Sequence, residues 1–181
     1  MRFINTEIQG LMLIEPVVHG DSRGYFLESF REDIFKKHAG DIIWVQENES
    51  MSGKGVLRGL HYQRGDFAQT KLVRVITGNV IDVVVDLRQD SKTFGKHLSF
   101  ELSGDNKKQL LIPKGFAHGF VVLSENAIFS YKVDNYYNKE SESGVRYDDR
   151  ELNIDWGIPQ NQMKLSEKDL QLPNLNNAEL F

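Results

Sequence analysis

One histidine stands within a stretch that otherwise has the pattern of a half-buried strand, V-L-R-G-L-H-Y-Q at residues 56–63. Side chains two residues apart in a strand point to the same face, so a metal site here would place a second histidine two positions after His61. The chain has Gln63 there. Without such a partner, a lone histidine on a strand is ordinarily a core residue bonded to the backbone.

A second histidine follows a turn in I-P-K-G-F-A-H-G-F, residues 112–120. A P-x-G-x-x-H turn that runs into a strand, downstream of a histidine-bearing strand, resembles the two-motif pattern of cupins, which are double-sheet jelly rolls. In metal cupins the motifs supply H-x-H, a glutamate and one more histidine. His61 and His118 match the outer positions, but Gln63 replaces a histidine and Lys71 lies near the glutamate position. A lysine only donates hydrogen bonds and repels a cation, so we expect no metal.

The composition limits the kind of protein. A chain of 181 residues, 40% of them hydrophobic and 27% charged, suits a single globular domain over residues 1–181. The net charge of −4 includes no basic cluster that would indicate nucleic-acid binding or an anionic membrane. The absence of cysteine excludes disulfides, thiolate nucleophiles and Cys-based zinc sites. We see no signal segment and no membrane span, so we expect a cytoplasmic protein.

Short strands separated by turn signals indicate an all-β sandwich or barrel. The dipeptide Gly78-Asn79 predicts a hairpin between two of the strands. Helix is expected only at residues 31–39, ending at Gly40, and in a short segment that begins near Ser166. The residues from 173 onward are expected to form a loosely held tail. The expected strands are residues 11–18, 25–30, 42–45, 56–63, 71–77, 80–87, 97–102, 109–112, 118–123 and 127–133, with a short last strand at 145–147.

Two of these strands mix charged and apolar residues on one face. In residues 80–87, Asp82 and Asp86 share a face with Val80 and Val84, and Lys71 likewise shares a face with valines in residues 71–77. Such a face is either solvated or part of the lined interior of an open barrel.

Several motifs occur together and in order: R-G-L-H-Y-Q, A-Q-T-K-L-V-R-V, D-V-V-V-D-L-R, I-P-K-G-F-A-H-G-F and L-S-E-K-D. Over residues 20–173 the chain resembles the dTDP-4-dehydrorhamnose 3,5-epimerases of deoxysugar biosynthesis, a metal-free cupin family. The resemblance implies a cupin-type jelly roll with a few short helices, no cofactor, and a nucleotide-linked 4-keto-6-deoxyhexose as substrate, in dTDP-L-rhamnose biosynthesis. It also implies a homodimer in which the partner's N-terminal strands complete the site.

The chemistry of such a substrate explains which residues are needed. The protons at C3 and C5 flank the C4 ketone, so their removal gives an enolate and requires a base, an acid on the opposite face and a cation near the enolate oxygen. The resemblance implies His61 as the base, oriented by Asp169, with Lys71 at the enolate and Tyr131 as proton donor. Each also has an ordinary structural role: a core histidine, a helix capping box at Ser166-x-x-Asp169, an exposed lysine, and a core tyrosine with its hydroxyl at the surface.

The resemblance also implies the residues that bind substrate. Arg58 and Arg23 match positions that hold the diphosphate, which suits the planar guanidinium group. His118 matches a contact near the sugar, and Tyr137 matches the aromatic residue that stacks on thymine. Further binding positions correspond to Glu28, Gln46, Asn48, Glu142 and Lys168.

The chain departs from the family pattern in three places. His19 stands where an aromatic residue is usual, residues 64–67 replace a segment in which proline is common, and Tyr137 stands in for a tryptophan. The sequence leaves three alternatives open. They are an enzyme that epimerises one carbon or isomerises the keto group, a non-catalytic cupin that binds sugars, and a metal-dependent dioxygenase or isomerase.

Overall fold

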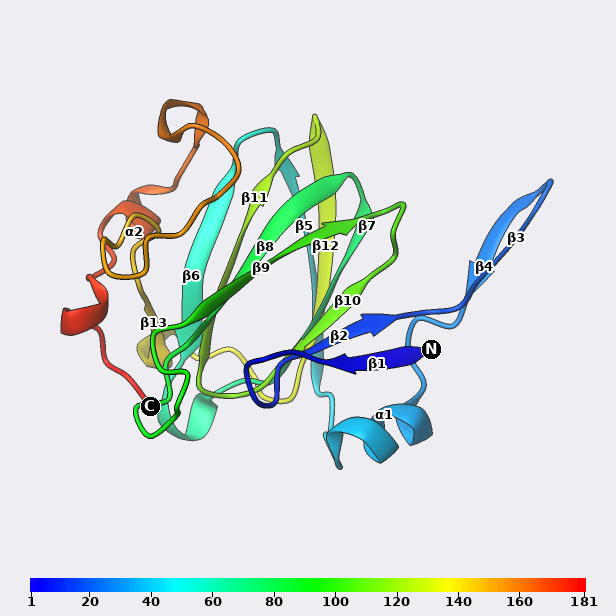
Figure 1. The fold of residues 1–181 in the computed structure, drawn as a ribbon, viewed down its shortest axis with the longest axis horizontal. Helices are drawn as coiled ribbons and strands as arrows, with labels where there is room; N and C mark the ends of the chain where they lie inside the picture. Colours follow the sequence, from blue (N-terminus) through cyan, green and yellow to red (C-terminus); the bar gives the residue numbers. More distant parts are fainter.

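The computed structural model describes residues 1–181, which form two facing antiparallel sheets (Figure 1). In spatial order, the six-stranded sheet contains β1 (Arg2–Asn5), β2 (Met12–Glu15), β10 (Gln109–Ile112), β7 (Lys71–Thr77), β12 (Asn126–Val133) and β5 (Gln46–Gly53). The five-stranded sheet contains β13 (Glu142–Gly144), β6 (Leu57–Gln63), β11 (Phe116–Val122), β8 (Asn79–Asp86) and β9 (His97–Ser103). The predicted all-β, cupin-type double-sheet jelly roll is confirmed.

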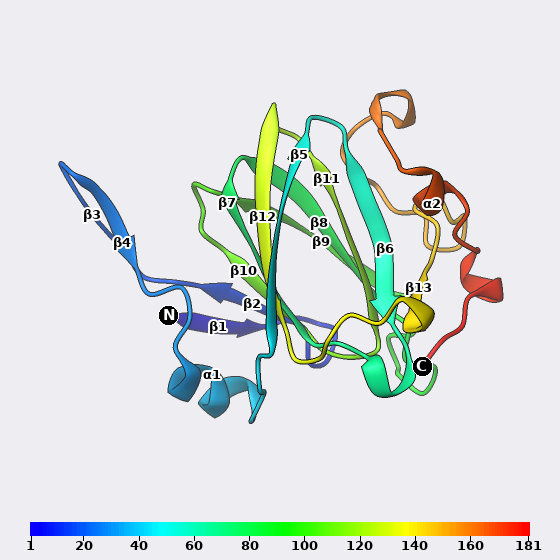
Figure 2. The same cartoon turned by 180° about the vertical axis from the view of Figure 1, so that it is seen from behind.

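Two more strands form an arm. β3 (Val18–Asp21) and β4 (Gly24–Leu27) pair only with each other, in a hairpin that extends away from the sandwich (Figures 1 and 2). The sequence predicts a strand that overlaps β4 but places β3 partly inside a longer strand at 11–18. Residues 19–21 fall outside the predicted strands, so β3 and its pairing with β4 were missed.

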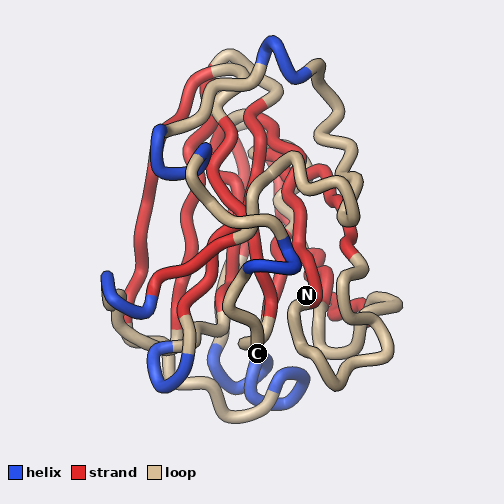
Figure 3. Tube along the Cα trace, turned by 90° about the vertical axis from the view of Figure 1, so that its left-hand side faces the viewer, coloured by secondary structure: helices blue, strands red, loops and turns tan.

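Helical segments lie at the periphery of the strands (Figure 3). The two predicted α-helices are confirmed: α1 (Glu32–Ala39) ends at Gly40, and α2 (Glu167–Leu170) begins after Ser166. No helix is long and apolar enough to cross a membrane. Single 3₁₀ turns complete the helical content, η1 (Gly65–Phe67), η2 (Lys139–Ser141), η3 (Gln160–Gln162) and η4 (Leu175–Asn177).

The turn at Gly78-Asn79 does not form the predicted hairpin. β7 pairs with β10 and β12, whereas β8 pairs with β9 and β11, so the two strands lie in different sheets. Gly78 has a φ of +84°, and a Cβ atom there would lie 2.1 Å from the carbonyl oxygen of Asn126. The turn therefore carries the chain between sheets under the β11–β12 connection. A local turn signal predicts a reversal of direction, but the pairing partner depends on residues far away in sequence.

In β8, the face that mixes valines with aspartates points to the interior between the sheets. Val80 and Val84 pack in the apolar cluster between the sheets, together with Val73 and Val75 of β7. The aspartates of β8 lie inside as well, fully buried. The alternative of a lined interior is therefore correct, and the alternative of a solvated face is wrong.

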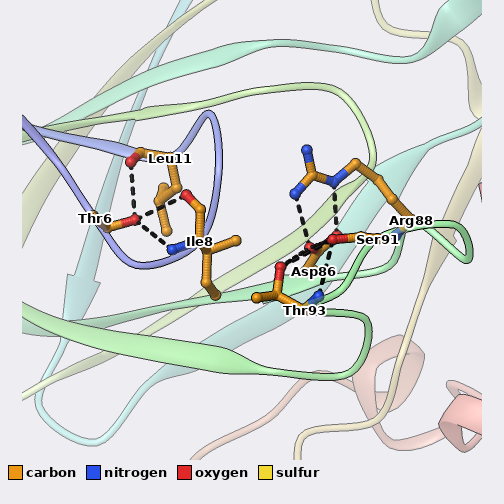
Figure 4. A network of polar contacts seen from close by, with 7 residues as sticks. All are labelled: Thr6, Ile8, Leu11, Asp86, Arg88, Ser91 and Thr93. Atoms are coloured by element: carbon orange, nitrogen blue, oxygen red, sulfur yellow. Dashed lines mark hydrogen bonds and ion pairs between the residues drawn. The ribbon is translucent and has the colours of Figure 1, made fainter.

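A polar network lies at the end of β8 (Figure 4). The Asp86 carboxylate accepts hydrogen bonds from Arg88 Nε and Nη2 at 2.8 Å each, from Ser91 Oγ at 2.7 Å and from Thr93 Oγ1 at 2.6 Å. Burial opposes the charge, but these donors outweigh it and lower the pKa of Asp86 to about 2. Beside this network, Thr6 Oγ1 donates to the backbone of the β1–β2 turn.

The outer face of β8 is also buried, because the C-terminal segment runs beside the five-stranded sheet (Figure 1). Val83 and Val85 pack with Trp156 and Leu175. The expectation of a loosely held tail from residue 173 is therefore wrong. Leu175 is only 5% exposed, and Tyr62 Oη donates to the carbonyl oxygen of Glu179 at 2.6 Å. The tail is mostly polar in sequence, but its leucines, alanine and phenylalanine pack in the apolar cluster on the outer face of the five-stranded sheet.

Two further strand predictions are wrong. Residues 42–45 are not a strand, and the strand that follows them, β5, was missed. Its sequence, Q-E-N-E-S-M-S-G, lacks the apolar alternation that predicts strands, because most of its side chains face solvent or a polar cavity. The last strand is β13, three residues before the predicted position at 145–147.

The packing of the tail leads to a test. We expect Leu175→Ala to lower the free energy of unfolding by about 2 to 4 kcal/mol, because it leaves a cavity in the outer apolar cluster. Leu170→Ala, at a leucine that is 49% exposed, should change it by less than about 0.5 kcal/mol. Urea unfolding of both variants measures the difference. Equal small effects would show that the tail does not contribute to the core.

Candidate active site

A cavity of about 590 Å³ lies between the sheets, with β5 on one side and β6 on the other. Residues of β7, β11, β12 and β13 and the segment 164–169 also line it. The structure brings most of the predicted site residues together here: Asn48, Arg58, His61, Lys71, His118, Tyr131, Glu142, Lys168 and Asp169.

A bulge in β6 places two of these residues on the same face. Arg58 and His61 are three positions apart, so a regular strand would turn them to opposite sides. Instead both line the cavity, while Leu60, between them, packs in the outer apolar cluster. The pairing of β6 with β11 shifts register between His118 and Phe120, next to Gly59. A regular alternation cannot produce this arrangement; one additional residue in β6 does.

His61 is held by a buried carboxylate from the far end of the chain. Its Nε2 lies 2.5 Å from Oδ1 of Asp169, a residue that is only 4% exposed. Burial raises the pKa of Asp169, but the hydrogen bonds from His61 and Ser166 outweigh it, so the net shift is downward. An ionised Asp169 accepts the Nε2 proton of His61, which leaves the lone pair on Nδ1.

Lys71 is the first residue of β7 and lies at the same level of the cavity. Its Nζ donates to the backbone oxygen of His61 at 3.4 Å. Burial lowers the pKa of Lys71 to about 8, against the opposing effect of the carboxylates of Asp82 and Glu142. At neutral pH the group is thus a mostly protonated ammonium, whose charge acts on an anion bound in the cavity.

Tyr131 approaches from the opposite wall. It lies on β12, in the six-stranded sheet, whereas His61 lies in the five-stranded sheet. Burial is the main cause that raises the pKa of Tyr131, so its hydroxyl group keeps its proton at neutral pH. The cavity therefore has a proton acceptor on one wall and a proton donor on the other.

His118 forms a second histidine–aspartate pair. Its Nε2 lies 2.8 Å from Oδ2 of Asp82, and both side chains are buried. Sequence analysis predicted His118 as a site residue and Asp82 as a possible lining residue, but not their contact. The contact follows from the register of β8 and β11, in which Phe120 stands opposite Asp82 and His118 opposite Val84. No spacing rule in the sequence encodes that register.

An ion pair crosses the rim of the cavity. Glu142 Oε2 lies 2.5 Å from Nζ of Lys168 and accepts a hydrogen bond from Tyr137 Oη at 2.8 Å. Burial raises the pKa of Glu142, but the hydrogen bonds from Lys168 and Tyr137 lower it by more. The Tyr137 ring is 55% exposed, and its backbone N–H donates to Gln46 Oε1. Gln46 and Tyr137 therefore lie beside the cavity, although they do not line it.

Two basic side chains without an ion-pair partner line the cavity near the start of β6. Arg58 Nε donates to Ser52 Oγ at 3.0 Å, which fixes the guanidinium group and leaves its two terminal nitrogens free. Lys164 and Val56 form an isolated parallel β-bridge, in which the backbone N–H of Leu57 donates to the carbonyl oxygen of Lys164 at 2.9 Å. The side chains of Lys164 and Val56 therefore lie on the same face. Sequence analysis missed Ser52 and Lys164, because only the docking of the C-terminal segment places Lys164 next to β6.

The structure does not bring Arg23 and Glu28 to the cavity of their own chain. Arg23 lies in the turn of the projecting hairpin, in an ion pair of 2.5 Å with Asp21, and Glu28 follows β4, 3.9 Å from Arg31. His19 also lies exposed on this arm. Gln63, at the position of the metal-cupin histidine, instead donates to the carbonyl oxygens of Phe67 and Tyr136.

Comparisons with known proteins give one family. Residues 5–177 match the family model described as dTDP-4-dehydrorhamnose 3,5-epimerase. The Escherichia coli (strain K12) protein of that name is 51% identical over 178 residues, which cover 97% of this chain and 95% of the relative.

Solved structures agree. The crystal structure of dTDP-4-dehydrorhamnose 3,5-epimerase from Elizabethkingia anophelis NUHP1 superposes with a TM-score of 0.94 at 52% identity, over 98% of this chain and 97% of that one. The dTDP-6-deoxy-D-glucose-3,5-epimerase from Legionella pneumophila Philadelphia 1, solved in complex with dTDP-4-keto-L-rhamnose, gives 0.93 at 50% identity, over 97% and 93%.

The environment of Lys71 leads to a prediction on stability. The ammonium loses its proton near pH 8 in the folded protein but near its ordinary value of 10.5 in the unfolded chain. Between these values the unfolded state binds more protons, so stability gains a contribution that rises with pH. Lys71→Met removes it. Urea unfolding at a series of pH values measures the free energy of unfolding of both proteins. The amount by which Lys71→Met exceeds the wild type should become smaller as the pH rises from 8 to 10.5. A difference that stays constant over this range would contradict the low pKa of Lys71.

Proposed function

The chain belongs to the dTDP-4-dehydrorhamnose 3,5-epimerase family, and we propose that it carries out the family reaction with His61 as base and Tyr131 as acid. It converts dTDP-4-dehydro-6-deoxy-D-glucose to dTDP-4-dehydro-L-rhamnose by inverting C3 and C5, a step of dTDP-L-rhamnose biosynthesis. The observation that supports the residue roles is the placement of His61 and Tyr131 on opposite walls of one cavity, with Lys71 at the level of the base.

Each inversion follows from this arrangement. His61 Nδ1 removes the proton from the carbon next to the ketone, and the electron pair moves to the C4 oxygen to give an enolate. The Lys71 ammonium stabilises the negative charge there, since a cation already fixed in position acts strongly on a developing anion. Tyr131 then donates its proton to the opposite face of the carbon, which inverts it, and is reprotonated afterwards. Asp169 stabilises the imidazolium formed at His61.

The remaining cavity residues suit the nucleotide part of the substrate. Arg58 and Lys164 lack ion-pair partners, and Arg58 presents two terminal nitrogens, so we assign both to the diphosphate. We assign the exposed ring of Tyr137 to stacking on thymine, with Gln46 and Asn48 beside it. His118 is assigned to the sugar. Glu142 and Lys168 are assigned to the rim that closes over the substrate.

A homodimer completes the site in this proposal. The hairpin of β3 and β4 has no core of its own, and it exposes Val18, Tyr25 and Phe26, the last of them 70% exposed. An isolated two-stranded hairpin is only marginally stable in water. We propose that it packs on a second copy of the chain and carries Arg23 and Glu28 to the partner's cavity. Residues 1–181 then act as one domain per subunit, in the cytoplasm.

The reaction predicts exchange with solvent. In D₂O, the protein should convert dTDP-4-dehydro-6-deoxy-D-glucose and place deuterium at both C3 and C5, as detected by mass spectrometry and NMR. His61→Ala should lower the rate by about 10²- to 10⁴-fold, the usual contribution of a general base, without loss of fold by circular dichroism. His97→Ala, on β9 and outside the cavity, is the matched control and should keep full activity.

Other outcomes would favour the alternatives. Deuterium at a single carbon indicates a single-carbon epimerase, with His19 as the first residue to exchange for an aromatic one. Tight binding without exchange indicates a non-catalytic sugar-binding cupin. Stoichiometric metal that is required for turnover indicates a metal enzyme. A His61→Ala variant that keeps wild-type turnover would refute the assignment of the base.

The dimer proposal predicts complementation between two inactive variants. Arg23→Ala and His61→Ala should each lose most activity as homodimers. In a heterodimer of the two, the His61 of the first chain meets the Arg23 of the second, so one of the two sites is intact and activity returns. Co-expression with two different tags and purification through both yields this heterodimer.

The matched control is a heterodimer of His61→Ala with Asp169→Ala. These residues act in the same chain's cavity, so each site keeps one defect and activity should stay lost. Failure of the first heterodimer to recover, together with full activity in a monomeric fraction, would show that the arm does not complete the partner's site.

A further inference from the structure

The hydroxyl group of Ser166 closes a small ring with Asp169. Ser166 Oγ lies 2.8 Å from Asp169 Oδ2, and the backbone N–H of Asp169 donates to the same Oγ at 3.1 Å. Since the N–H occupies an acceptor site of the hydroxyl group, the single hydroxyl proton is directed to Oδ2. One side chain thus fixes both the backbone and the carboxylate of Asp169.

This ring continues into the catalytic pair. The other carboxylate oxygen of Asp169, Oδ1, lies 2.5 Å from Nε2 of His61. Ser166, Asp169 and His61 therefore form one chain of hydrogen bonds, from the N-terminus of α2 to the base on β6. The carboxylate is buried, and Ser166 is the sole side-chain donor to Oδ2, so loss of that hydroxyl would remove a hydrogen bond from a buried acceptor.

We propose that Ser166 is a positioning residue of the epimerisation: its hydroxyl group fixes the Asp169 carboxylate so that the His61 ring presents Nδ1 to the sugar. The inference rests on the proposed roles of His61 and Asp169. Ser166 is also the N-cap of α2, a role that accounts for the backbone bond but not for the bond to Oδ2.

The ionisable groups around the pair come from both sheets and from α2. Glu142 approaches from β13 and is already paired with Lys168 of α2, and Lys71 of β7 donates to the His61 backbone. Tyr131 stands across the cavity on β12, His118 lies on β11 in register with His61, and Arg58 lies on β6 itself. None of them bonds to Asp169 Oδ2. The hydroxyl group stabilises the carboxylate anion, so its removal makes the His61–Asp169 pair more basic and lets it hold its proton to higher pH.

Three variants separate the two roles of Ser166. Ser166→Ala removes both the cap and the donor, Ser166→Thr keeps both, and Ser166→Asp keeps a capping oxygen but has no proton to donate and repels Asp169. The pH profile of kcat/KM is measured for each with dTDP-4-dehydro-6-deoxy-D-glucose. Thermal unfolding and the ¹⁵N chemical shifts of the His61 ring are measured in parallel.

We expect kcat/KM of Ser166→Ala to fall about 5- to 30-fold, as for a lost hydrogen bond to a buried charge, mainly through kcat. Its acidic limb should move to higher pH. Ser166→Thr should restore both rate and limb, and Ser166→Asp should move the limb further although it caps the helix. The ¹⁵N shifts should show a change in the His61 protonation equilibrium in the alanine and aspartate variants.

The inference is overturned if Ser166→Ala and Ser166→Asp keep the wild-type pH profile and ¹⁵N shifts and lose only thermal stability. Ser166 would then be a helix cap alone. This result differs from a failure of the proposed function, in which the wild-type protein itself shows no turnover and no deuterium exchange. If a variant is too unstable for kinetics, the ¹⁵N shifts of Ser166→Thr against wild type and Ser166→Ala decide the question.

Discussion

The geometry of the cavity depends on one steric constraint, the close approach of β6 and β11 at Gly59 and Gly119. A Cβ atom at Gly59 would lie 2.5 Å from the Cα of Gly119, and a Cβ atom at Gly119 would lie 2.7 Å from the carbonyl oxygen of Arg58. Because neither position has a side chain, the two backbones can touch where β6 bulges. The bulge turns Arg58 and His61 to the cavity and keeps the flanking leucines in the outer cluster.

The second requirement is that a distant segment reaches the base. α2 has only four residues, far fewer than an isolated helix needs for stability in water. It is held instead by the apolar residues around it, which bury the outer face of β8 and β6, and by the backbone bridge between Lys164 and Val56. Hydrophobic burial along the outer face thus provides the stability that allows Asp169 to lie charged and buried next to His61.

The charges of the cavity divide into paired and unpaired groups. Asp169 pairs with His61, Asp82 with His118 and Glu142 with Lys168. Three cations, Arg58, Lys71 and Lys164, form no ion pair, and Glu49 is the remaining carboxylate on the wall. A chain with a net charge of −4 therefore gathers three cations without ion-pair partners in one cavity, which suits a diphosphate at one end and an enolate at the other. Net charge alone could not have indicated this.

The amino-acid sequence alone is enough to predict the fold class, two helices, most of the central strands and the family. Alternation of apolar residues and helix-capping signals act over a few positions, so residues 56–63, 71–77 and 31–39 could be predicted directly. The polar lining of Asp82 and Lys71 was left open, since periodicity shows that they share a face with valines but not which way that face points. Tertiary structure decided the rest: that Gly78 crosses between sheets, that the tail packs on β8, that Asp82 meets His118, and that Lys164 lies beside β6. Each of these depends on contacts between segments far apart in the chain, and these contacts are set by how two sheets bury their faces together rather than by any local pattern.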